Sequence, residues 1–354
     1  MLTRRSLLGG LAAGYLAADA APQDLPLRQR AAKSGRFYGC AAGSYQLDDA
    51  EFAQVLGREA NILVPEYELK RLIVEPSPGQ FDYSGADRLL AYAAAHGMAM
   101  RGHTLVWYAA NPDWLEAKVL GAPDDEILTD YTARLVRRYR GKMHSWDVVN
   151  EALYPQDGRA DGLRNCIWLK RFGPGYIDLA YHAAKQADPD ALLVYNDWGC
   201  EGGEAWNDRF RAATLKFLEG ALARKVPIEA LGLQGHLSAF GPPVDQKKLR
   251  DFLDQVRAMG LRILVTEHDV DDSKGPSDIA LRDRAVGDAS ARFLDVALAN
   301  QATLAVLTWG LSDRFLKSDG GLRALLSGYS PRKLPLDVNL ERTPMWGAIA
   351  KAFR

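Results

Sequence analysis

Short apolar runs alternate with amphipathic stretches along the chain from about residue 36 onward. Runs of this kind are typical of strands that are buried on both faces. Between them, apolar residues recur at spacings of three and four, which predicts helices that each bury one side. The predicted strands cover residues 37–42, 62–66, 99–105, 145–150, 192–196, 231–235, 263–267 and 304–309. The predicted helices include residues 86–96, 130–138, 176–185, 206–223, 247–258, 283–299 and 344–353.

The strict alternation of strands and helices predicts a parallel sheet whose strands are joined by right-handed crossovers. An open, doubly wound sheet and a closed eight-fold barrel both satisfy this pattern. The loop after the first strand, Cys40-Ala41-Ala42-Gly43, lacks the glycine-rich phosphate motif of an open nucleotide-binding sheet. We therefore predict the α/β class and a single (β/α)8 TIM barrel, which 354 residues can form as one domain.

The first 21 residues have the features of an export signal. Arg4 and Arg5 resemble a twin-arginine signal, residues 7–18 are mostly apolar, and Ala18-Asp19-Ala20 has the form of a cleavage site. The apolar stretch is too short for a membrane span, which needs about 20 residues. We predict a cleaved signal at 1–21, a catalytic barrel at 22–354, and an exported protein that is periplasmic or secreted. An uncleaved anchor and a general secretory signal stay open as alternatives.

The amino-acid composition restricts the kinds of molecule that the protein is expected to bind. The chain has 44 Lys and Arg against 45 Asp and Glu, a formal net charge of -1, which disfavours binding to nucleic acid or to an acidic membrane surface. We expect a monomer that does not contact a membrane once the signal is removed. Three cysteines are too few for a disulfide framework. Cys166 and Cys200 fall in successive predicted loops, and geometry decides whether they pair.

Polar and aromatic residues collect where the predicted strands end. In a barrel of this class the strand ends meet at one rim, which carries the active site. Ordinary turns supply mainly Gly, Asn, Asp and Ser, whereas this rim would hold His, Trp and Glu, which bond to or stack on a sugar. The strand ends carry, in chain order, Glu66, His103 with Trp107, Asn150 with Glu151, Asn196 with Asp197, Gln234 with His236, Glu267 with Asp269, and Trp309.

Glu151 and Glu267 form the pair of carboxyl groups that cleavage of a glycosidic bond requires. Each closes an apolar run, so the fold delivers each to the rim. One carboxyl of such a pair donates a proton as general acid, and the other acts as nucleophile or base. Either residue taken alone is an ordinary solvated charge at the end of a strand. Together, within this set of strand-end residues, they predict a catalytic centre.

Alternation within the strands predicts how the nucleophile is supported, because residues two apart share a face. Glu267 and Asp269 point to one side, and Gln234 and His236 do likewise. His236 can then lie between the two carboxylates, oriented by Asp269 and donating to Glu267. Such a donor holds Glu267 ionised, as a nucleophile must be.

Six short motifs, in order along the chain, carry a family resemblance. They are Arg101-Gly-His-Thr-Leu-Val-Trp107, Trp146-Asp-Val-Val-Asn-Glu-Ala152, Tyr195-Asn-Asp197, Gln234-Gly-His236, Val265-Thr-Glu-His-Asp269 and Thr308-Trp309. A segment near the C-terminus, Leu334-Pro-Leu-Asp337, matches as well. Over roughly residues 36–353 the chain resembles glycoside hydrolase family 10, the endo-β-1,4-xylanases.

The resemblance implies a barrel that hydrolyses xylan or xylo-oligosaccharides with retained anomeric configuration, without a cofactor or a metal. It implies Glu151 as acid/base, Glu267 as nucleophile, and Asn150 as the residue that bonds the 2-hydroxyl of the sugar at the cleaved bond. The further substrate-binding residues that it implies are Glu66, Lys70, His103, Trp107, Gln234, His236 and Trp309, with Asn196 and Asp269 supporting them.

The chain departs from the family at positions that bind the sugar one place outward from the cleaved bond. Tyr67 stands where the family has Asn, Ala110 where it has Gln, and Lys317 where it has Trp. Each change alters a contact on the glycone side of the site. An alternative is therefore that the same catalytic groups act on another β-linked or decorated oligosaccharide.

A metal-dependent barrel hydrolase is an alternative from another class. Its candidate ligands are His103, His236, Asp197 and Glu267. Such sites commonly open with paired histidines, and the first predicted strand has none. The sequence therefore favours catalysis by carboxyl groups.

Overall fold

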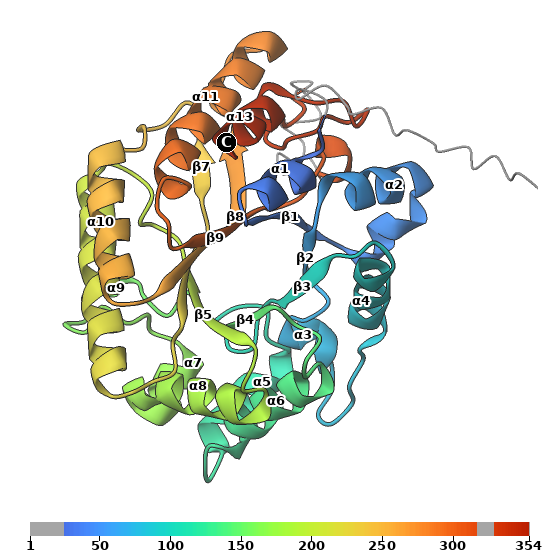
Figure 1. The fold of residues 1–354 in the computed structure, drawn as a ribbon. Helices are drawn as coiled ribbons and strands as arrows, with labels where there is room; N and C mark the ends of the chain where they lie inside the picture. Colours follow the sequence, from blue (N-terminus) through green and yellow to red (C-terminus); the bar gives the residue numbers. More distant parts are fainter. Residues whose placement is uncertain (1–24, 317–328, 354) are drawn as a thin grey trace, which may run out of the picture.

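The strands form a closed barrel surrounded by helices (Figure 1). The computed structural model describes residues 25–316 and 329–353, so the predicted signal at 1–21 and Lys317 lie outside the described residues. The barrel strands pair in parallel, and β6 pairs with β8 to close the ring, which confirms the predicted (β/α)8 barrel. These strands are β1 (Phe37–Ala42), β2 (Ile62–Pro65), β3 (Ala99–Gly102), β4 (Ser145–Asn150), β5 (Leu192–Asp197), β6 (Ala230–Leu233), β8 (Arg262–Asp271) and β9 (Thr303–Thr308).

Helices in the connections form the outer layer, and each helix predicted from apolar spacing is present. Asp49, Asp245 and Asp278 each begin a helix by accepting backbone N–H groups of its first turn. A cap of this kind stabilises a helix by about 1 kcal/mol. The helices are α1 (Leu27–Lys33), α2 (Ala50–Glu59), α3 (Arg71–Val74), α4 (Ser84–Ala95), α5 (Asp113–Gly121), α6 (Glu126–Arg138), α7 (Ile167–Phe172), α8 (Tyr176–Ala187), α9 (Ala205–Ala223), α10 (Gln246–Ala258), α11 (Ile279–Ala297) and α13 (Pro344–Ala352).

Alternate residues of the barrel strands enter two separate cores, as side chains of a closed sheet must. Inside the barrel, Ile62 and Val64 of β2 belong to one cluster with Leu264 of β8 and Leu307 of β9. Leu63, between the two β2 residues, belongs to the larger core that the helices cover. The inner cluster fills the barrel, so the polar side chains at the strand ends lie over a packed floor.

Two strands that carry polar residues at the rim end earlier than the sequence predicts. The strand predicted at 231–235 ends earlier, at Leu233, because Gly235 has a φ of +79° and turns the chain. A short strand, β7 (His236–Ser238), follows and pairs with the far end of β8, which runs on to Asp271. In that pairing His236 lies opposite Asp269. Their contact therefore arises between two strands. The prediction that side chains alternate continuously along the sixth strand is wrong. The strand predicted at 99–105 likewise ends at Gly102.

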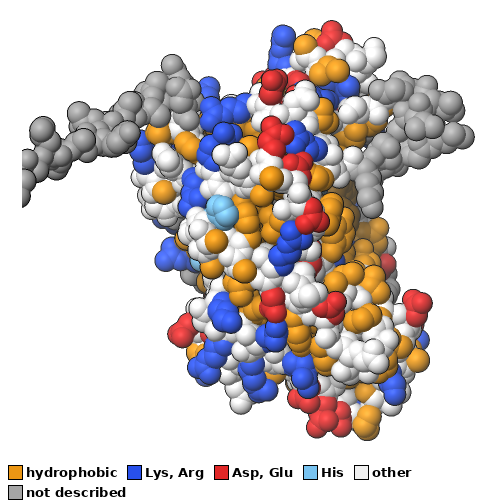
Figure 2. Space-filling view, turned by 90° about the vertical axis from the view of Figure 1, so that its right-hand side faces the viewer, with side chains coloured by type: hydrophobic (Ala, Val, Ile, Leu, Met, Phe, Trp, Pro, Cys, Tyr) orange, Lys and Arg blue, Asp and Glu red, His pale blue; other side chains and the backbone are white. Residues whose placement is uncertain are grey.

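The cysteines are unpaired, and the surface carries charges of both signs. Cys40, Cys166 and Cys200 are free, so Cys166 and Cys200 do not pair. On the face shown in Figure 2, basic and acidic side chains are interspersed, in keeping with the near-zero net charge. None of the described helices is both long enough and apolar enough to cross a bilayer.

Candidate active site

The predicted residues meet in one pocket of about 320 Å³ at the C-terminal ends of the strands, here called the carboxylate pocket. The structure brings nine predicted residues together there and adds Trp198. Glu66 is not part of the lining, and Asn196 and Asp269 lie behind it as supports. The lining residues are Lys70, His103, Trp107, Asn150, Glu151, Trp198, Gln234, His236, Glu267 and Trp309.

Glu151 lies just after β4 with its backbone in the left-handed region, at a φ of +55°. A non-glycine residue in this region costs free energy, so the surroundings must hold it there. The Glu151 amide donates to the Asn196 carbonyl at 2.9 Å, and Arg164 Nε donates to the Glu151 carbonyl at 2.9 Å. These two bonds fix the peptide groups on both sides of the residue and aim its side chain into the pocket.

The Glu151 carboxyl has different partners on its two oxygens. Oε1 accepts from Gln234 Nε2 at 3.1 Å and from Asn150 Nδ2 at 3.2 Å. Oε2 lies 3.9 Å from the Arg164 guanidinium. The two amide donors on Oε1 therefore fix the orientation of the carboxyl.

Glu267 is held by donors on both oxygens. Oε1 accepts from Asn196 Nδ2 at 2.6 Å, and Oε2 lies 3.3 Å from His236 Nε2. The other imidazole nitrogen, Nδ1, lies 2.7 Å from Asp269 Oδ1. The predicted contacts of His236 with both carboxylates are therefore confirmed.

The electrostatics of this group favour an ionised Glu267. Burial by itself would lower the pKa of His236, but Asp269 and then Glu267 outweigh it and hold that pKa well above its usual value. Because 37% of the His236 side chain is exposed, the imidazole keeps part of its solvation. Burial would likewise raise the pKa of Glu267, yet the His236 hydrogen bond, the imidazole of His103 and the Asn196 amide together lower it.

Asn196 joins the two halves of the pocket. Its Nδ2 donates to both Asn150 Oδ1, at 2.8 Å, and Glu267, while its Oδ1 accepts from Thr266 Oγ1 at 2.6 Å. A Cβ on Gly232 would lie 2.4 Å from Asn196 Oδ1, so only glycine leaves room for this amide. A single buried side chain thus fixes the positions of Asn150 and Glu267 relative to each other.

Lys70 closes one side of the pocket within a set of aromatic rings. Its Nζ lies 5.0, 5.3 and 5.6 Å from the ring centroids of Tyr67, Trp107 and Trp309. Burial lowers the pKa of Lys70, and the surrounding glutamates, among them Glu66, oppose that shift. Glu66 therefore acts on the site through the charge of Lys70, from outside the lining.

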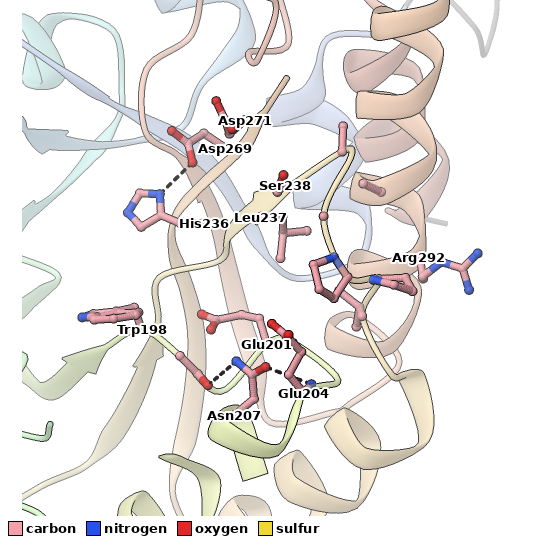
Figure 3. Close-up of a pocket in the computed structure, with 18 of the residues that line it drawn as sticks. Trp198, Glu201, Glu204, Asn207, His236, Leu237, Ser238, Asp269, Asp271 and Arg292 are labelled. Atoms are coloured by element: carbon pink, nitrogen blue, oxygen red, sulfur yellow. Dashed lines mark hydrogen bonds and ion pairs between the residues drawn. The ribbon is translucent and has the colours of Figure 1, made fainter. Parts of the chain in front are cut away.

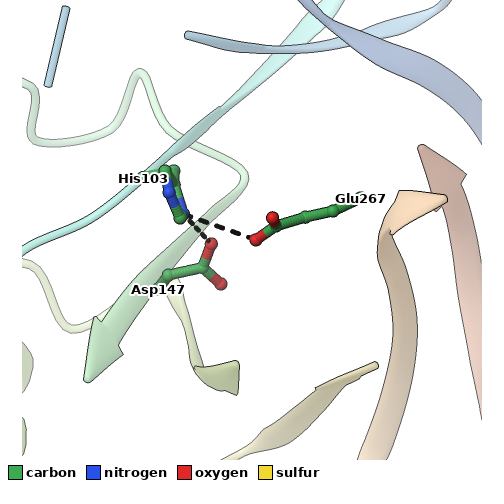
Figure 4. Close-up of side chains that lie close together, drawn as sticks. All are labelled: His103, Asp147 and Glu267. Carbon is green, nitrogen blue, oxygen red and sulfur yellow. Dashed lines mark hydrogen bonds and ion pairs between the residues drawn. The ribbon is translucent and has the colours of Figure 1, made fainter. Parts of the chain in front are cut away.

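His103, Asp147 and Glu267 form the group of potential metal ligands found among the described residues, with ligand atoms within 4.8 Å of one another (Figure 4). His103 Nδ1 lies 2.9 Å from Asp147 Oδ2, and Arg101, which is fully buried, makes an ion pair with the other oxygen of Asp147. The guanidinium already neutralises Asp147, and Glu267 is engaged by Asn196 and His236. This donor set therefore fits a hydrogen-bonded imidazole better than a cation. His236 and Asp197, the other ligands considered from the sequence, are not in the group.

Sequence reasoning missed three residues of the site. Asp147 orients His103, and its signal was a lone charge inside an apolar strand. Trp198 lines the pocket, and its signal was an aromatic residue directly after the Asn196-Asp197 pair. Arg164 comes from a loop 13 residues after Glu151, and no local pattern marks it.

A family model described as glycosyl hydrolase family 10 matches residues 26–352. Endo-1,4-beta-xylanase B of Thermotoga neapolitana is 31% identical over 331 residues, covering 92% of this chain and 91% of that protein. Endo-1,4-beta-xylanase C of Paenibacillus barcinonensis is 33% identical over 318 residues, covering 80% of this chain and 28% of that longer protein.

Solved structures agree in fold over nearly the whole chain. The native xylanase 10B from Thermotoga maritima superposes with a TM-score of 0.81 at 28% identity, covering 93% of this chain and 98% of that chain. The GH10 structure from Paenibacillus barcinonensis has a TM-score of 0.79 at 30% identity, covering 92% and 97%. Two glutamates that share one pocket, the asparagine and histidine that hold Glu267, and a family match across the barrel agree, and the chain belongs to glycosyl hydrolase family 10.

Proposed function

We propose that the protein is a retaining endo-1,4-β-xylanase that hydrolyses internal xylosidic bonds of xylan by double displacement. The observation that carries the proposal is that Glu267, with donors on both oxygens, shares one pocket with Glu151. The relatives named endo-1,4-beta-xylanase support the substrate class.

In the first step, Glu267 attacks the anomeric carbon as that carbon's bond to the leaving oxygen breaks. Glu151 gives its proton to the leaving oxygen, so the sugar departs as an alcohol, and the glycone stays bound to Glu267 as an ester. His236 and Asn196 keep the Glu267 oxygens ionised and in place before the attack.

In the second step, Glu151 has lost its proton and acts as base. It takes a proton from a water molecule, whose oxygen attacks the anomeric carbon and releases the Glu267 carboxylate. Two inversions at one carbon give net retention. Asn150, which already contacts Glu151, is placed to bond the 2-hydroxyl of the sugar, and Trp107 and Trp309 wall the glycone side.

Assay of the purified protein on xylan, xylo-oligosaccharides and cellulose tests this function. We expect hydrolysis of xylan with a rapid fall in viscosity, and NMR should detect the β-anomer as the first product. First appearance of the α-anomer would contradict the retaining mechanism. Turnover of cellulose with none of xylan would contradict the substrate.

His236 also predicts a pH dependence. His236→Gln removes the charge that lowers the pKa of Glu267, so the nucleophile should become protonated, and inactive, at a higher pH. The acidic limb of the kcat/KM profile should move up by roughly one to two pH units. The matched control is His182→Gln on the exposed side of α8, which should leave the profile unchanged. An unmoved limb in His236→Gln would show that His236 does not tune Glu267.

One observation on the glycone side favours an alternative substrate. Tyr67, 47% exposed, holds its ring 5.0 Å from Lys70 Nζ, where the family has a shorter hydrogen-bonding amide. The same catalytic groups would then serve another β-linked or a decorated oligosaccharide. Lys317, the third altered position, lies outside the described residues.

The double variant Tyr67→Asn with Ala110→Gln tests this alternative. If it restores two sugar hydrogen bonds at roughly 0.5–1.5 kcal/mol each, kcat/KM on plain xylotetraose should rise by about tenfold. Ala110 has a φ of +49°, and Gln, which also carries a Cβ, adds little backbone strain there. Ala109→Gln in place of Ala110→Gln is the control. No gain, or a loss, would indicate that Tyr67 already serves the natural sugar.

We also propose that residues 1–21 direct export by the twin-arginine route and that the mature protein is a monomer away from the membrane. The supports are the Arg4-Arg5 pair, the short apolar stretch and the near-zero net charge. Replacing both arginines with lysines should retain the precursor inside the cell, as cell fractionation would detect. Unchanged export of that variant would favour a general secretory signal.

A further inference from the structure

His268 follows Glu267 directly on β8 and has no part in the two reaction steps described above. Its side chain is fully buried. The imidazole Nδ1 lies 2.8 Å from the carbonyl oxygen of Gly235, and Nε2 lies 2.9 Å from Ser290 Oγ of α11. A single buried ring with both nitrogens engaged therefore connects β8, helix α11 and the turn at Gly235.

The partners of His268 determine which of its nitrogens carries the proton. Burial lowers the pKa of His268 to about 4, so the imidazole is neutral near neutral pH. A carbonyl oxygen can only accept, so Nδ1 carries the hydrogen and donates it to Gly235. Nε2 then accepts from the hydroxyl of Ser290, which is itself fully buried. The imidazole is therefore fixed in one tautomer and one orientation.

Gly235 has a second buried anchor on its other side. Its amide donates to Glu201 Oε1 at 2.9 Å, and Glu201, from the loop after β5, is 4% exposed (Figure 3). In the same peptide group, the carbonyl of Gln234 accepts from the Glu267 amide at 2.9 Å. The peptide group before Gly235 is thus held by Glu201 and Glu267, and the one after it is held by His268.

The residues on either side of Gly235 contact the two carboxyl groups proposed as catalytic. Gln234 Nε2 donates to Glu151 Oε1 at 3.1 Å, and His236 Nε2 lies 3.3 Å from Glu267 Oε2. Gly235 has a φ of +79° and no side chain, so packing of its own cannot fix the turn. The positions of both contacts therefore depend on the hydrogen bonds that hold the Gly235 peptide groups.

We propose that His268 is a positioning residue that, through the Gly235 carbonyl, holds segment 234–236 against both carboxyl groups. This inference rests on the proposed function, because those carboxyl groups are the ones that carry out the reaction. The nitrogens of His268 contact the turn and α11, so the residue acts on the reaction through the turn. Loss of its hydrogen bond loosens Gln234 and His236 together, although neither of them is replaced.

The variants His268→Leu and His268→Asn test this role. Leucine cannot donate to Gly235, whereas asparagine places an amide N–H near the position of Nδ1. His268→Leu should move the acidic limb of the kcat/KM profile up by roughly one pH unit, because Glu267 loses part of the His236 contact that favours its ionised form. It should also lower kcat/KM by roughly tenfold more for xylan than for an aryl xylobioside with an acidic phenol, because Glu151 loses its alignment. His268→Asn should restore both values toward those of the wild type.

The shift of the acidic limb reports the turn because His268 is neutral, so its replacement removes no charge from the carboxylate pocket. Other titratable groups face Glu267, and the hydrogen-bond partners of His268 include none of them. These groups are His236 with Asp269 behind it, His103 with Asp147 behind it, Lys70, and Glu151 across the pocket.

Further variants separate positioning from a loss of stability. Val296→Ala removes buried methyl groups from the helix that carries Ser290, and it should lower the melting temperature without moving the acidic limb. In the double variant His236→Gln with His268→Leu, the limb should lie no higher than in His236→Gln alone. Additive shifts, or an unmoved limb in His268→Leu, overturn the proposal. If His268→Leu does not fold, Ser290→Ala, which frees the imidazole from α11, must move the limb in the same direction, and no movement overturns the proposal.

A titration followed by NMR separates this proposal from the proposed function. If the protein hydrolyses no xyloside, the proposed function fails, but the pKa of His236 can still be measured from its imidazole resonances in the intact protein. Against the effect of burial, Asp269 and Glu267 hold this pKa well above its usual value. In His268→Leu the pKa of His236 should fall by about one pH unit, because the imidazole is no longer kept against those carboxylates. In His268→Asn it should stay near the wild-type value. An unchanged pKa of His236 in His268→Leu overturns the positioning role.

Discussion

Glu267→Ala is expected to abolish turnover on every β-xyloside, whatever the acidity of its leaving group. Without this carboxylate no covalent glycosyl-enzyme forms, so an activated leaving group cannot rescue the first step. Loss of a catalytic nucleophile in a covalent enzyme costs on the order of 10⁴–10⁶-fold in kcat. Steady-state assays on xylan, xylotetraose and an activated aryl xylobioside should all show a loss of this size.

Glu267→Gln is the matched variant. It keeps the side-chain volume and an oxygen that can accept from Asn196 or His236, but it removes the negative charge. It should be as inactive as Glu267→Ala while retaining the melting temperature of the wild type more closely, because the buried site stays filled. Substantial activity of either variant on aryl xylobiosides would contradict the assignment of Glu267 as nucleophile.

Glu151→Ala is expected to lose activity according to how much help the leaving group needs from a proton. On xylan, whose leaving alcohol needs a proton, kcat/KM should fall by roughly 10²–10⁴-fold, the usual contribution of a general acid. On an aryl xylobioside with an acidic phenol, the first step should be nearly unaffected. The second step lacks its base, so the glycosyl-enzyme should accumulate, with an initial burst of phenol followed by slow turnover.

Azide provides the decisive readout for this variant. The small anion can enter the space left by Glu151 and attack the anomeric carbon without a base, which should speed turnover and yield the β-glycosyl azide. Glu151→Gln, which fills the space and retains contacts to Gln234 and Asn150, should show the same dependence on leaving group with little azide rescue. If azide instead rescues Glu267→Ala and gives the α-azide, the two roles are reversed.

The sequence by itself determined the barrel and the two carboxyl groups that we propose as catalytic. Apolar periodicity is local, and right-handed crossovers restrict how alternating strands and helices assemble, so the parallel barrel followed from the pattern. Glu151 and Glu267 followed because residues near the C-terminal ends of the barrel strands reach the same rim wherever they lie in the chain. The motifs around them then identified the family resemblance.

Only the tertiary structure decided how those carboxyls are held. The left-handed backbone of Glu151 depends on Arg164, which no local pattern connects to it. His236 meets Asp269 because the chain turns at Gly235 and starts a new strand against β8, a pairing that strand alternation does not contain. Such features depend on which chain segments become neighbours and on the space between them, and these are properties of the folded chain as a whole.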